Sequence, residues 1–165
     1  AEYTHEPKLY GGLISQHRSG DSSFYHYDAI GTTRALTDSS QTVTDTAVYT
    51  AFGEKTASVG STVNSMRFCG EAGYHAENLP SGTFNIRART YASEMGRWKS
   101  FDPLAGANGS ATYSIPTHGY QYCNNNPVIY VDPSGLVAIT FDLVAKSYIR
   151  GVVPEGAIEL VSKPA

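Results

Sequence analysis

A short unit that begins with tyrosine and closes at glycine recurs along this chain of 165 residues. The first copy spans residues 27–31 and the second spans residues 49–53, and looser copies follow at Tyr74 and Tyr91. The leading tyrosines stand 22, 25 and 17 residues apart, a length that fits one β-hairpin per copy better than one helix. Self-similarity at roughly 20–50 residues is typical of arrays in which each unit buries its face against its neighbours. The sequence therefore predicts an all-β repeat built from successive antiparallel hairpins.

Composition supports short strands and excludes several classes of function. The chain has 12 Tyr, 16 Gly and 8 Pro with only 16% charged residues, which favours strands interrupted by turns. The net charge of −3 comes without a basic run, so no nucleic-acid partner and no anionic membrane surface is indicated. No stretch approaches the ~20 apolar residues that span a bilayer, so we expect no membrane insertion. Because the chain starts at Ala1 without a signal-peptide pattern, we expect a mature or excised piece of something longer.

The cysteines and histidines indicate little chemistry of their own. Cys69 and Cys123 could form a disulfide, or each could be a small buried hydrophobic residue, and the sequence leaves both open. The five histidines are scattered, without the spacing of a metal site, so neither a metal nor a cofactor is predicted. Nothing local supports a nucleophilic cysteine–histidine pair.

Alternation and turn-forming residues divide the chain and place the expected strands. We expect a leading strand region at residues 1–23, a β domain at 24–136 and a more aliphatic tail at 137–165. Residues 56–64 lack sustained periodicity and are expected to form a polar loop, with an insertion at 104–118. The expected strands are residues 8–17, 24–28, 32–37, 42–50, 66–69, 83–91, 96–101, 119–123 and 128–131.

The clearest alternation lies in residues 83–91, which are expected to form one strand. Phe84 and Ile86 would point to one face of that strand, and Arg87 and Arg89 to the other. Two arginines on one strand face are ordinarily solvated. In a sheet that curls into a wall, the same face could present Arg89 to an acidic partner.

Eight short blocks of sequence carry a resemblance to a known family. In one-letter code they are YHYDAIG at 25–31, RFCG at 67–70, IRARTY at 86–91, GRW at 96–98, FDP at 101–103, YQY at 120–122, NNP at 125–127 and YVDPSGL at 130–136. In this order the chain resembles the C-terminal core of the RHS/YD-repeat family, as found in toxin-complex C subunits and bacterial polymorphic toxins. The resemblance implies repeats that form a spiralling β-sheet closed into a hollow shell, with this core plugging one end. The remainder of a larger RHS protein would then be its partner.

The resemblance also implies a self-cleaving activity, because toxin-bearing members cut themselves after an Asp-Pro-x-Gly-Leu motif to free a C-terminal cargo. Carried over by position, the two catalytic carboxylates match Asp102 and Asp132, and the supporting arginine matches Arg89. The bond cut would be Leu136–Val137. General acid–base chemistry supports these roles independently of the resemblance. Two neighbouring carboxylates cannot both ionise, so one acts as the acid while the other activates water. An arginine beside them could hold one carboxylate ionised and stabilise the developing oxyanion.

Other interpretations of these residues stay open. Arg87 and Arg97 could replace Arg89 if the register differs, and residues 132–135 also fit a plain type I turn. The alternative function is therefore a structural or adhesive β-repeat module that is not an enzyme. Its open strand edges would favour self-association with further chains. Either function suits a secreted or cell-surface protein, and we expect a bacterial one.

Overall fold

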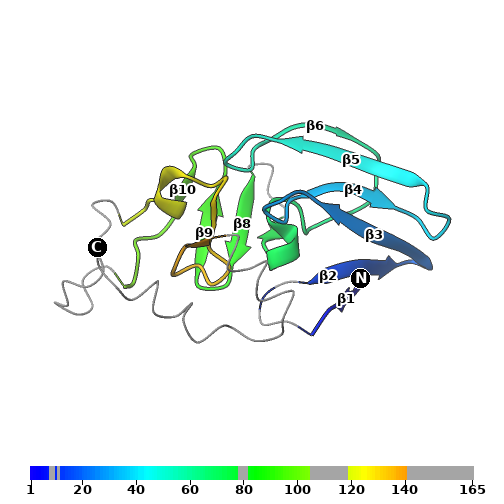
Figure 1. Ribbon diagram of the computed structural model, residues 1–165, viewed down its shortest axis with the longest axis horizontal. Coiled ribbons are helices and arrows are strands. Elements are labelled where there is room, and N and C mark those ends of the chain that lie inside the picture. The colour runs from blue at the N-terminus through cyan, green and yellow to red at the C-terminus, as the bar shows by residue number, and fades with distance from the viewer. Residues whose placement is uncertain (8–9, 11, 78–81, 105–118, 141–165) are drawn as a thin grey trace.

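The computed structural model describes residues 1–7, 10, 12–77, 82–104 and 119–140. Within these residues the chain forms a six-stranded sheet, a four-stranded sheet and a two-stranded ladder, all antiparallel, with two short 3-10 turns. In Figure 1 the six-stranded sheet occupies one end of the described structure, and the shorter strands β8–β10 lie beside it. The predicted all-β fold is confirmed. No helix in this part of the chain is long and apolar enough to cross a membrane.

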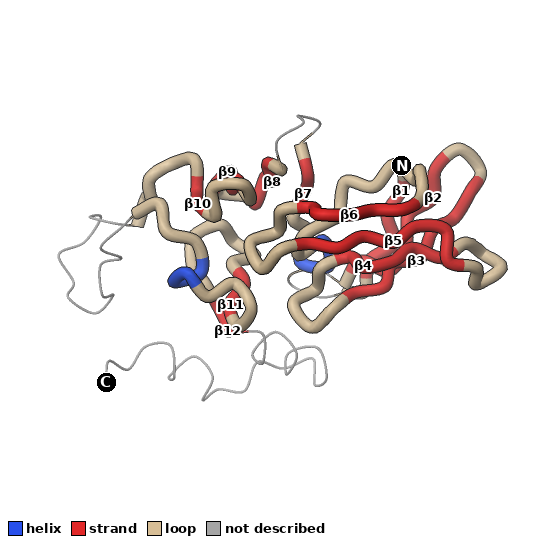
Figure 2. Tube along the Cα trace, turned by 90° about the horizontal axis from the view of Figure 1, so that it is seen from above, coloured by secondary structure: helices blue, strands red, loops and turns tan. Residues whose placement is uncertain are grey.

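The six-stranded sheet is a simple meander. Its strands lie in space in the order of the sequence, each antiparallel to the next, and both views show them side by side (Figures 1 and 2). The open edges of the sheet are its first and last strands. The strands are β1 (Glu2–His5), β2 (Leu13–Arg18), β3 (Asp21–Tyr27), β4 (Thr33–Thr37), β5 (Val43–Tyr49) and β6 (Lys55–Val59).

The first tyrosine unit forms the turn between β3 and β4. The N–H of Asp28 donates to the Thr32 carbonyl at 3.0 Å, and the N–H of Gly31 donates back to the Asp28 carbonyl at 3.0 Å. The Asp28 carboxylate also accepts the N–H of Thr32 at 2.9 Å. Gly31 has a φ of +75°, a left-handed conformation that costs glycine little. This unit is a hairpin turn, as the repeat predicts.

Two further turns repeat that geometry. Between β5 and β6, the N–H of Gly53 donates to the Thr50 carbonyl at 3.0 Å, and Gly53 has a φ of +87°. Between β4 and β5, Gln41 takes the place of the glycine: its N–H donates to the Asp38 carbonyl at 3.0 Å and its φ is +66°. The tyrosine unit predicts the Gly53 turn, whereas the Asp38 turn contains neither a tyrosine nor a glycine that would predict it.

The four-stranded sheet has the order β10-β9-β8-β7 and covers the larger hydrophobic core. Its strands are β7 (His75–Ala76), β8 (Thr83–Ile86), β9 (Arg89–Ala92) and β10 (Arg97–Trp98). Aromatic rings dominate this core, which includes Phe68, Tyr74, Phe84, Tyr91, Trp98 and Tyr122. The smaller core lies against the six-stranded sheet and consists of Leu13, Tyr25 and Leu36, with partly buried neighbours.

A two-stranded ladder brings the start of the expected tail back onto the core. Strand β11 (Tyr130–Val131) pairs with β12 (Ile139–Thr140), and Ala138 and Ile139 pack against the larger core. The segment between the two strands contains the Asp132–Gly135 turn, which is closed by a 3.3 Å bond from the Gly135 N–H to the Asp132 carbonyl. This turn confirms the interpretation of residues 132–135 as a β-turn.

Several expected elements are wrong. Residues 56–64 are expected to form a loop, but most of β6 lies there. No residue of this edge strand is buried, so its sequence lacks the alternation that would predict a strand. Residues 66–69 make one isolated bridge, from Met66 to His75, and then enter the 3-10 turn η1 (Gly70–Ala72).

Other boundaries shift. The expected first strand at 8–17 is observed as β2, and β1 precedes it. The expected strand at 119–123 contributes one bridge, from Gln121 to Arg97, before the 3-10 turn η2 (Cys123–Asn125). Nearly all of the expected insertion, residues 105–118, lies outside the described residues.

Candidate functional site

The expected single strand at residues 83–91 is in fact a tight hairpin, and this reverses the predicted orientation of Arg89. Strands β8 and β9 are joined by Arg87 and Ala88, and Arg87 has a left-handed φ of +45°. Ile86 pairs with Arg89 across the hairpin, so the two side chains share a face. That face is the core face, and the Arg89 side chain is only 3% exposed. Arg89 is therefore a buried arginine, not a solvated one.

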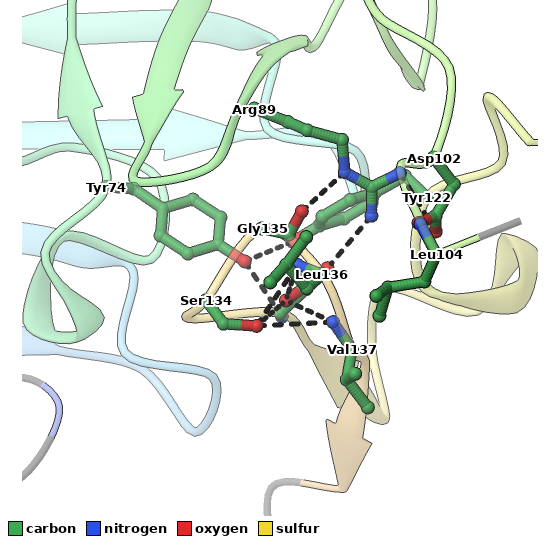
Figure 3. A network of polar contacts seen from close by, with 10 residues as sticks. Tyr74, Arg89, Asp102, Leu104, Tyr122, Ser134, Gly135, Leu136 and Val137 are labelled. Carbon is green, nitrogen blue, oxygen red and sulfur yellow. Dashed lines mark hydrogen bonds and ion pairs between the residues drawn. The ribbon is translucent and has the colours of Figure 1, made fainter. Parts of the chain in front are cut away.

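Arg89 is the centre of the predicted site (Figure 3). Its Nη1 lies 3.1 Å from Asp102 Oδ2, an ion pair that lacks the alignment of a hydrogen bond. Its Nη2 lies 3.5 Å from Asp132 Oδ2, and its Nε donates to the Gly135 carbonyl. The guanidinium also lies 4.1 Å from the centre of the Trp98 ring, a favourable cation–π distance. The structure thus brings together Arg89, Asp102 and Asp132, the three residues that sequence singles out.

Asp132 holds the bond predicted to be cut. Its Oδ1 accepts the backbone N–H of Leu136 at 3.1 Å and the N–H of Val137 at 3.1 Å. The Ser134 hydroxyl donates to the same oxygen at 2.9 Å. Since the Val137 nitrogen belongs to the Leu136–Val137 peptide bond, a carboxyl group lies within hydrogen-bonding distance of the atom that would leave. Figure 3 shows these contacts converging beneath Arg89.

Burial changes the acidity of Asp132. Removal from water raises the pKa of this carboxyl, while bonds from the Ser134 hydroxyl, the Arg89 charge and the amides of Leu136 and Val137 oppose the shift. The net pKa is above the ordinary value of 3.8. A carboxyl with a raised pKa keeps its proton to higher pH, which is the property required of a general acid.

Asp102 approaches Arg89 from a more open position than Asp132. Its side chain is 13% exposed, against 3% for Asp132. The Asp102 Oδ1 accepts the Leu104 N–H at 2.9 Å, and the Asp102 N–H donates to the Gly119 carbonyl at 2.9 Å. Water can reach Asp102 more readily than Asp132. The pair therefore has one carboxyl near solvent and one inside the protein.

Two buried tyrosines complete the network, a role that no pattern in the sequence indicates. The Tyr74 and Tyr122 hydroxyls lie 3.0 Å apart, and the Asp132 N–H donates to Tyr74 at 2.9 Å. Burial raises the pKa of both phenols well above the usual value, so they act here as neutral hydrogen-bonding groups. Tyr74 leads one of the repeat units and Tyr122 belongs to one of the family blocks, which were the only signals available. Their contact spans 48 positions in the sequence.

The described residues offer no alternative site built on a metal or a thiol. They contain no group of three or more His, Cys, Asp or Glu arranged to hold an ion. Cys69 and Cys123 are free and buried rather than paired. Burial raises the pKa of both thiols, which opposes formation of the nucleophilic thiolate.

Comparison with known proteins adds a sequence relationship. No family model matches the chain. The tRNA3(Ser)-specific nuclease WapA of Bacillus spizizenii is 37% identical over 128 residues, which are 76% of this chain and 5% of that protein. The tRNA nuclease WapA of Bacillus subtilis (strain 168) is 36% identical over 115 residues, 68% of this chain. The chain thus spans about 5% of the length of these curated relatives.

Solved structures share the fold. The crystal structure of TcdB2-TccC3 matches with a TM-score of 0.60 and 21% identity, covering 73% of this chain and 6% of that chain. The structure of TcdB2-TccC3-Cdc42 matches 75% of this chain with a TM-score of 0.59. Both sets of findings are consistent with an RHS-associated domain. At 21% identity, the solved structures show a shared fold.

Proposed function

We propose that this RHS-core-like module cuts its own chain at the Leu136–Val137 bond. The observation that carries the proposal is the position of Asp132, whose Oδ1 accepts the N–H groups of both Leu136 and Val137. Arg89 faces Asp132 and Asp102 at once, at 3.5 and 3.1 Å. An aspartate that only closed a turn would not require a second carboxylate on the same buried arginine.

The residues divide the reaction between them. Asp102, the more exposed carboxylate, takes a proton from a water molecule, and the oxygen of that water attacks the Leu136 carbonyl carbon. Arg89 stabilises the oxyanion that forms on the Leu136 oxygen. Asp132, whose raised pKa favours the protonated form, gives its proton to the Val137 nitrogen as the C–N bond breaks. One water is consumed, and the immediate products are a carboxylic acid at Leu136 and an amine at Val137. The acid then becomes a carboxylate as its proton returns to Asp132, and Asp102 releases its proton to solvent, where the new amine takes one up.

Intact-mass spectrometry of the purified full chain tests this activity. Without added protease, the wild type should slowly produce one fragment that ends at Leu136 and one that begins at Val137. Asp102→Asn should abolish the cut, because an amide cannot take and return a proton. Asp45→Asn, which changes a carboxylate of the six-stranded sheet, is the matched control and should be cut like the wild type. Wild type and Asp102→Asn remaining at full mass after prolonged incubation would refute the activity.

The module would act within a larger protein. We propose a secreted bacterial parent in which the module closes an RHS shell and separates a C-terminal segment from it. The WapA relatives, named as tRNA nucleases, are much longer than this chain, which supports a part that serves a toxin rather than the toxic activity itself. Expression of a longer parent chain with Asp102→Asn should leave its C-terminal segment attached, whereas the unchanged parent should release it as a separate polypeptide.

A structural role is the second candidate, and the six-stranded sheet favours it. Every residue of edge strand β6 is exposed, and its neighbour β5 exposes Val43 and Val48 at 58% and 53%. The unpaired backbone groups of an exposed edge strand offer a template for pairing with another strand, and the exposed valines of β5 add apolar surface beside it. Light scattering of the isolated chain should then show association that rises with concentration, and a monomer at high concentration would count against this role.

A further inference from the structure

The β8–β9 hairpin donates hydrogen bonds to three successive carbonyls of the segment before the proposed cut. The Arg87 guanidinium donates to the Pro133 carbonyl, and the Ala88 N–H donates to the Ser134 carbonyl at 3.3 Å. The Arg89 Nε donates to the Gly135 carbonyl. Three neighbouring residues of the hairpin thus bind residues 133–135 in order. The next carbonyl along the chain is that of Leu136, the one that would be attacked.

The fit of Gly135 shows how closely the segment lies against the hairpin. A Cβ atom at this position would stand 2.3 Å from the Ile86 carbonyl oxygen and 3.0 Å from the Arg89 nitrogen. Both are backbone atoms, which cannot move aside as the end of a flexible side chain can. Gly135 also has a φ of +74°, which side-chain-bearing residues rarely adopt. Only glycine allows this approach.

We infer that the β8–β9 hairpin is a substrate cradle, which selects the bond to be cut by binding the backbone carbonyls of residues 133–135. This inference rests on the proposed self-cleavage. Arg87 acts in it as a positioning residue, because it touches the substrate segment two carbonyls before Gly135 and not the reacting atoms. Gly135 acts as the specificity-determining residue. The substrate class is a β-turn segment with glycine immediately before the residue whose carbonyl is attacked.

The opposite side of the segment is held as well. While the hairpin binds its carbonyls, Asp132 Oδ1 binds the N–H groups of Leu136 and Val137. The backbone N–H of Leu136 is therefore fixed by the Asp132 carboxyl group. This arrangement aligns one peptide bond between the hairpin and the carboxyl group.

Arg87 is itself held in place for this task. Its Nη1 also donates to the Ala72 carbonyl at 3.2 Å, at the end of η1. Its guanidinium lies 5.0 Å from the centre of the Tyr10 ring. These contacts restrict a side chain that otherwise has several rotatable bonds. The donor aimed at Pro133 is therefore pre-organised, which is what positioning requires.

The first test measures the rate of self-cleavage by intact mass. Arg87→Ala should slow the cut by on the order of tenfold to a hundredfold, because a displacement of about 1 Å at the reacting atoms has that effect. Arg87→Lys should restore part of the rate, since an ammonium group can still donate to the Pro133 carbonyl. Arg97→Ala, which removes an exposed arginine of β10, should leave the rate unchanged.

The second test does not depend on cleavage. In the uncut Asp102→Asn background, hydrogen–deuterium exchange reports how tightly the amides of Leu136 and Val137 are held. Adding Arg87→Ala or Gly135→Ala should speed exchange of those amides by about tenfold or more, because the segment would open locally. The amides of β3 and β4 should exchange as before, which separates loss of the cradle from global unfolding.

The two tests separate the inference from the activity on which it rests. If the wild type is never cut, the proposed function fails, and the exchange result still decides whether the hairpin holds the segment. If the wild type is cut but Arg87→Ala changes neither the rate nor the exchange of Leu136 and Val137, the cradle is refuted. A slowed cut with faster local exchange, partly rescued by Arg87→Lys, supports it.

Discussion

The six-stranded sheet and the region around Arg89 are both antiparallel β-structure, yet they are stabilised differently. The sheet is a meander of short hairpins in which each strand contacts its sequence neighbours. Its buried core is small, with Leu13, Tyr25 and Leu36. Its turns are local, and three of them repeat one pattern of backbone hydrogen bonds.

The region around Arg89 depends instead on contacts between distant parts of the sequence. The Arg89 side chain binds Asp132 across 43 positions, and Tyr74 binds Tyr122 across 48. Its core is an aromatic cluster, in which the Phe68 ring lies 6.0 Å from those of both Tyr74 and Tyr91. The comparison indicates that repeated local hairpins provide the scaffold, while the chemistry lies where the repeat gives way to long-range packing.

The largest expected effect is the loss of the aromatic core. Phe68 is 1% exposed, so Phe68→Ala should lower the free energy of unfolding by about 3–5 kcal/mol, because it removes a buried ring and leaves a cavity. Val59→Ala, at an exposed position of β6, should change it by no more than about 0.5 kcal/mol. Chemical denaturation measures both. Equal losses would mean that the two regions are not stabilised differently.

The second effect compares two glycines with similar backbones and different surroundings. A Cβ at Gly53 would stand 2.4 Å from the Phe68 ring, whereas nothing lies within 4 Å of a Cβ at Gly20. Both residues have left-handed φ values, +87° and +94°, so alanine carries a backbone cost of about 1–2 kcal/mol at either one. Gly53→Ala should lose about 1–3 kcal/mol more through overpacking. Similar thermal unfolding of the two variants would contradict the close packing of this turn against the aromatic core.

The local region is also the one that could be predicted from sequence. The hairpins at residues 27–31 and 49–53 follow from tyrosine, glycine and alternation, and both are observed. The Asp38 turn lies between the expected strands 32–37 and 42–50, but its left-handed geometry could not be predicted, because Gln41 occupies the position where glycine would have been a signal. Strand β6 was missed because its residues are all exposed, which removes the period that identifies a strand.

The site could be predicted in its members but not in its geometry. The family blocks led to Arg89, Asp102 and Asp132, and the structure brings them together; their catalytic roles stay a prediction. The predicted orientation of Arg89 was wrong because Arg87 and Ala88 form a two-residue turn. This turn lacks the glycine, asparagine or aspartate that is typical of such turns. The tyrosine pair could not be predicted, since no local pattern connects residues that meet only after folding.

The third effect tests whether the Asp38 turn follows the same rule as the tyrosine turns. Gln41 holds a φ of +66°, a conformation that strains a residue with a side chain. Gln41→Gly should therefore stabilise the protein by about 0.5–1 kcal/mol, the relief of strain being partly offset by greater freedom of glycine in the unfolded chain. Thermal unfolding measures the gain. A lower melting temperature would show that the glutamine side chain makes a compensating contribution.

The smallest effect concerns two aspartates, one from each region, whose pKa values shift in opposite directions. Burial raises the pKa of Asp132 above 3.8, so the folded state holds a proton there that the unfolded chain has released. Its contribution to stability is therefore lost as the pH rises through the raised value. At Asp45 burial also acts to raise the pKa, but hydrogen bonds from Thr62 and Thr44 outweigh it and the pKa falls below 3.8. The contribution of Asp45 is present above 3.8 and is lost as the pH falls through the lowered value.

Each aspartate can be isolated by comparing the wild type, freshly purified and uncut, with its own asparagine variant over a range of pH. Relative to Asp132→Asn, the wild type should gain stability as the solution is acidified from neutral pH toward about pH 4, because asparagine does not titrate. Relative to Asp45→Asn, the wild type should lose stability as the pH is lowered further, below about pH 4. If acidification instead costs the wild type stability relative to Asp132→Asn, the Arg89 charge and the Ser134 hydroxyl outweigh burial. Asp132 would then be ionised in the folded protein, and its role as the proton donor to Val137 would have to pass to Asp102.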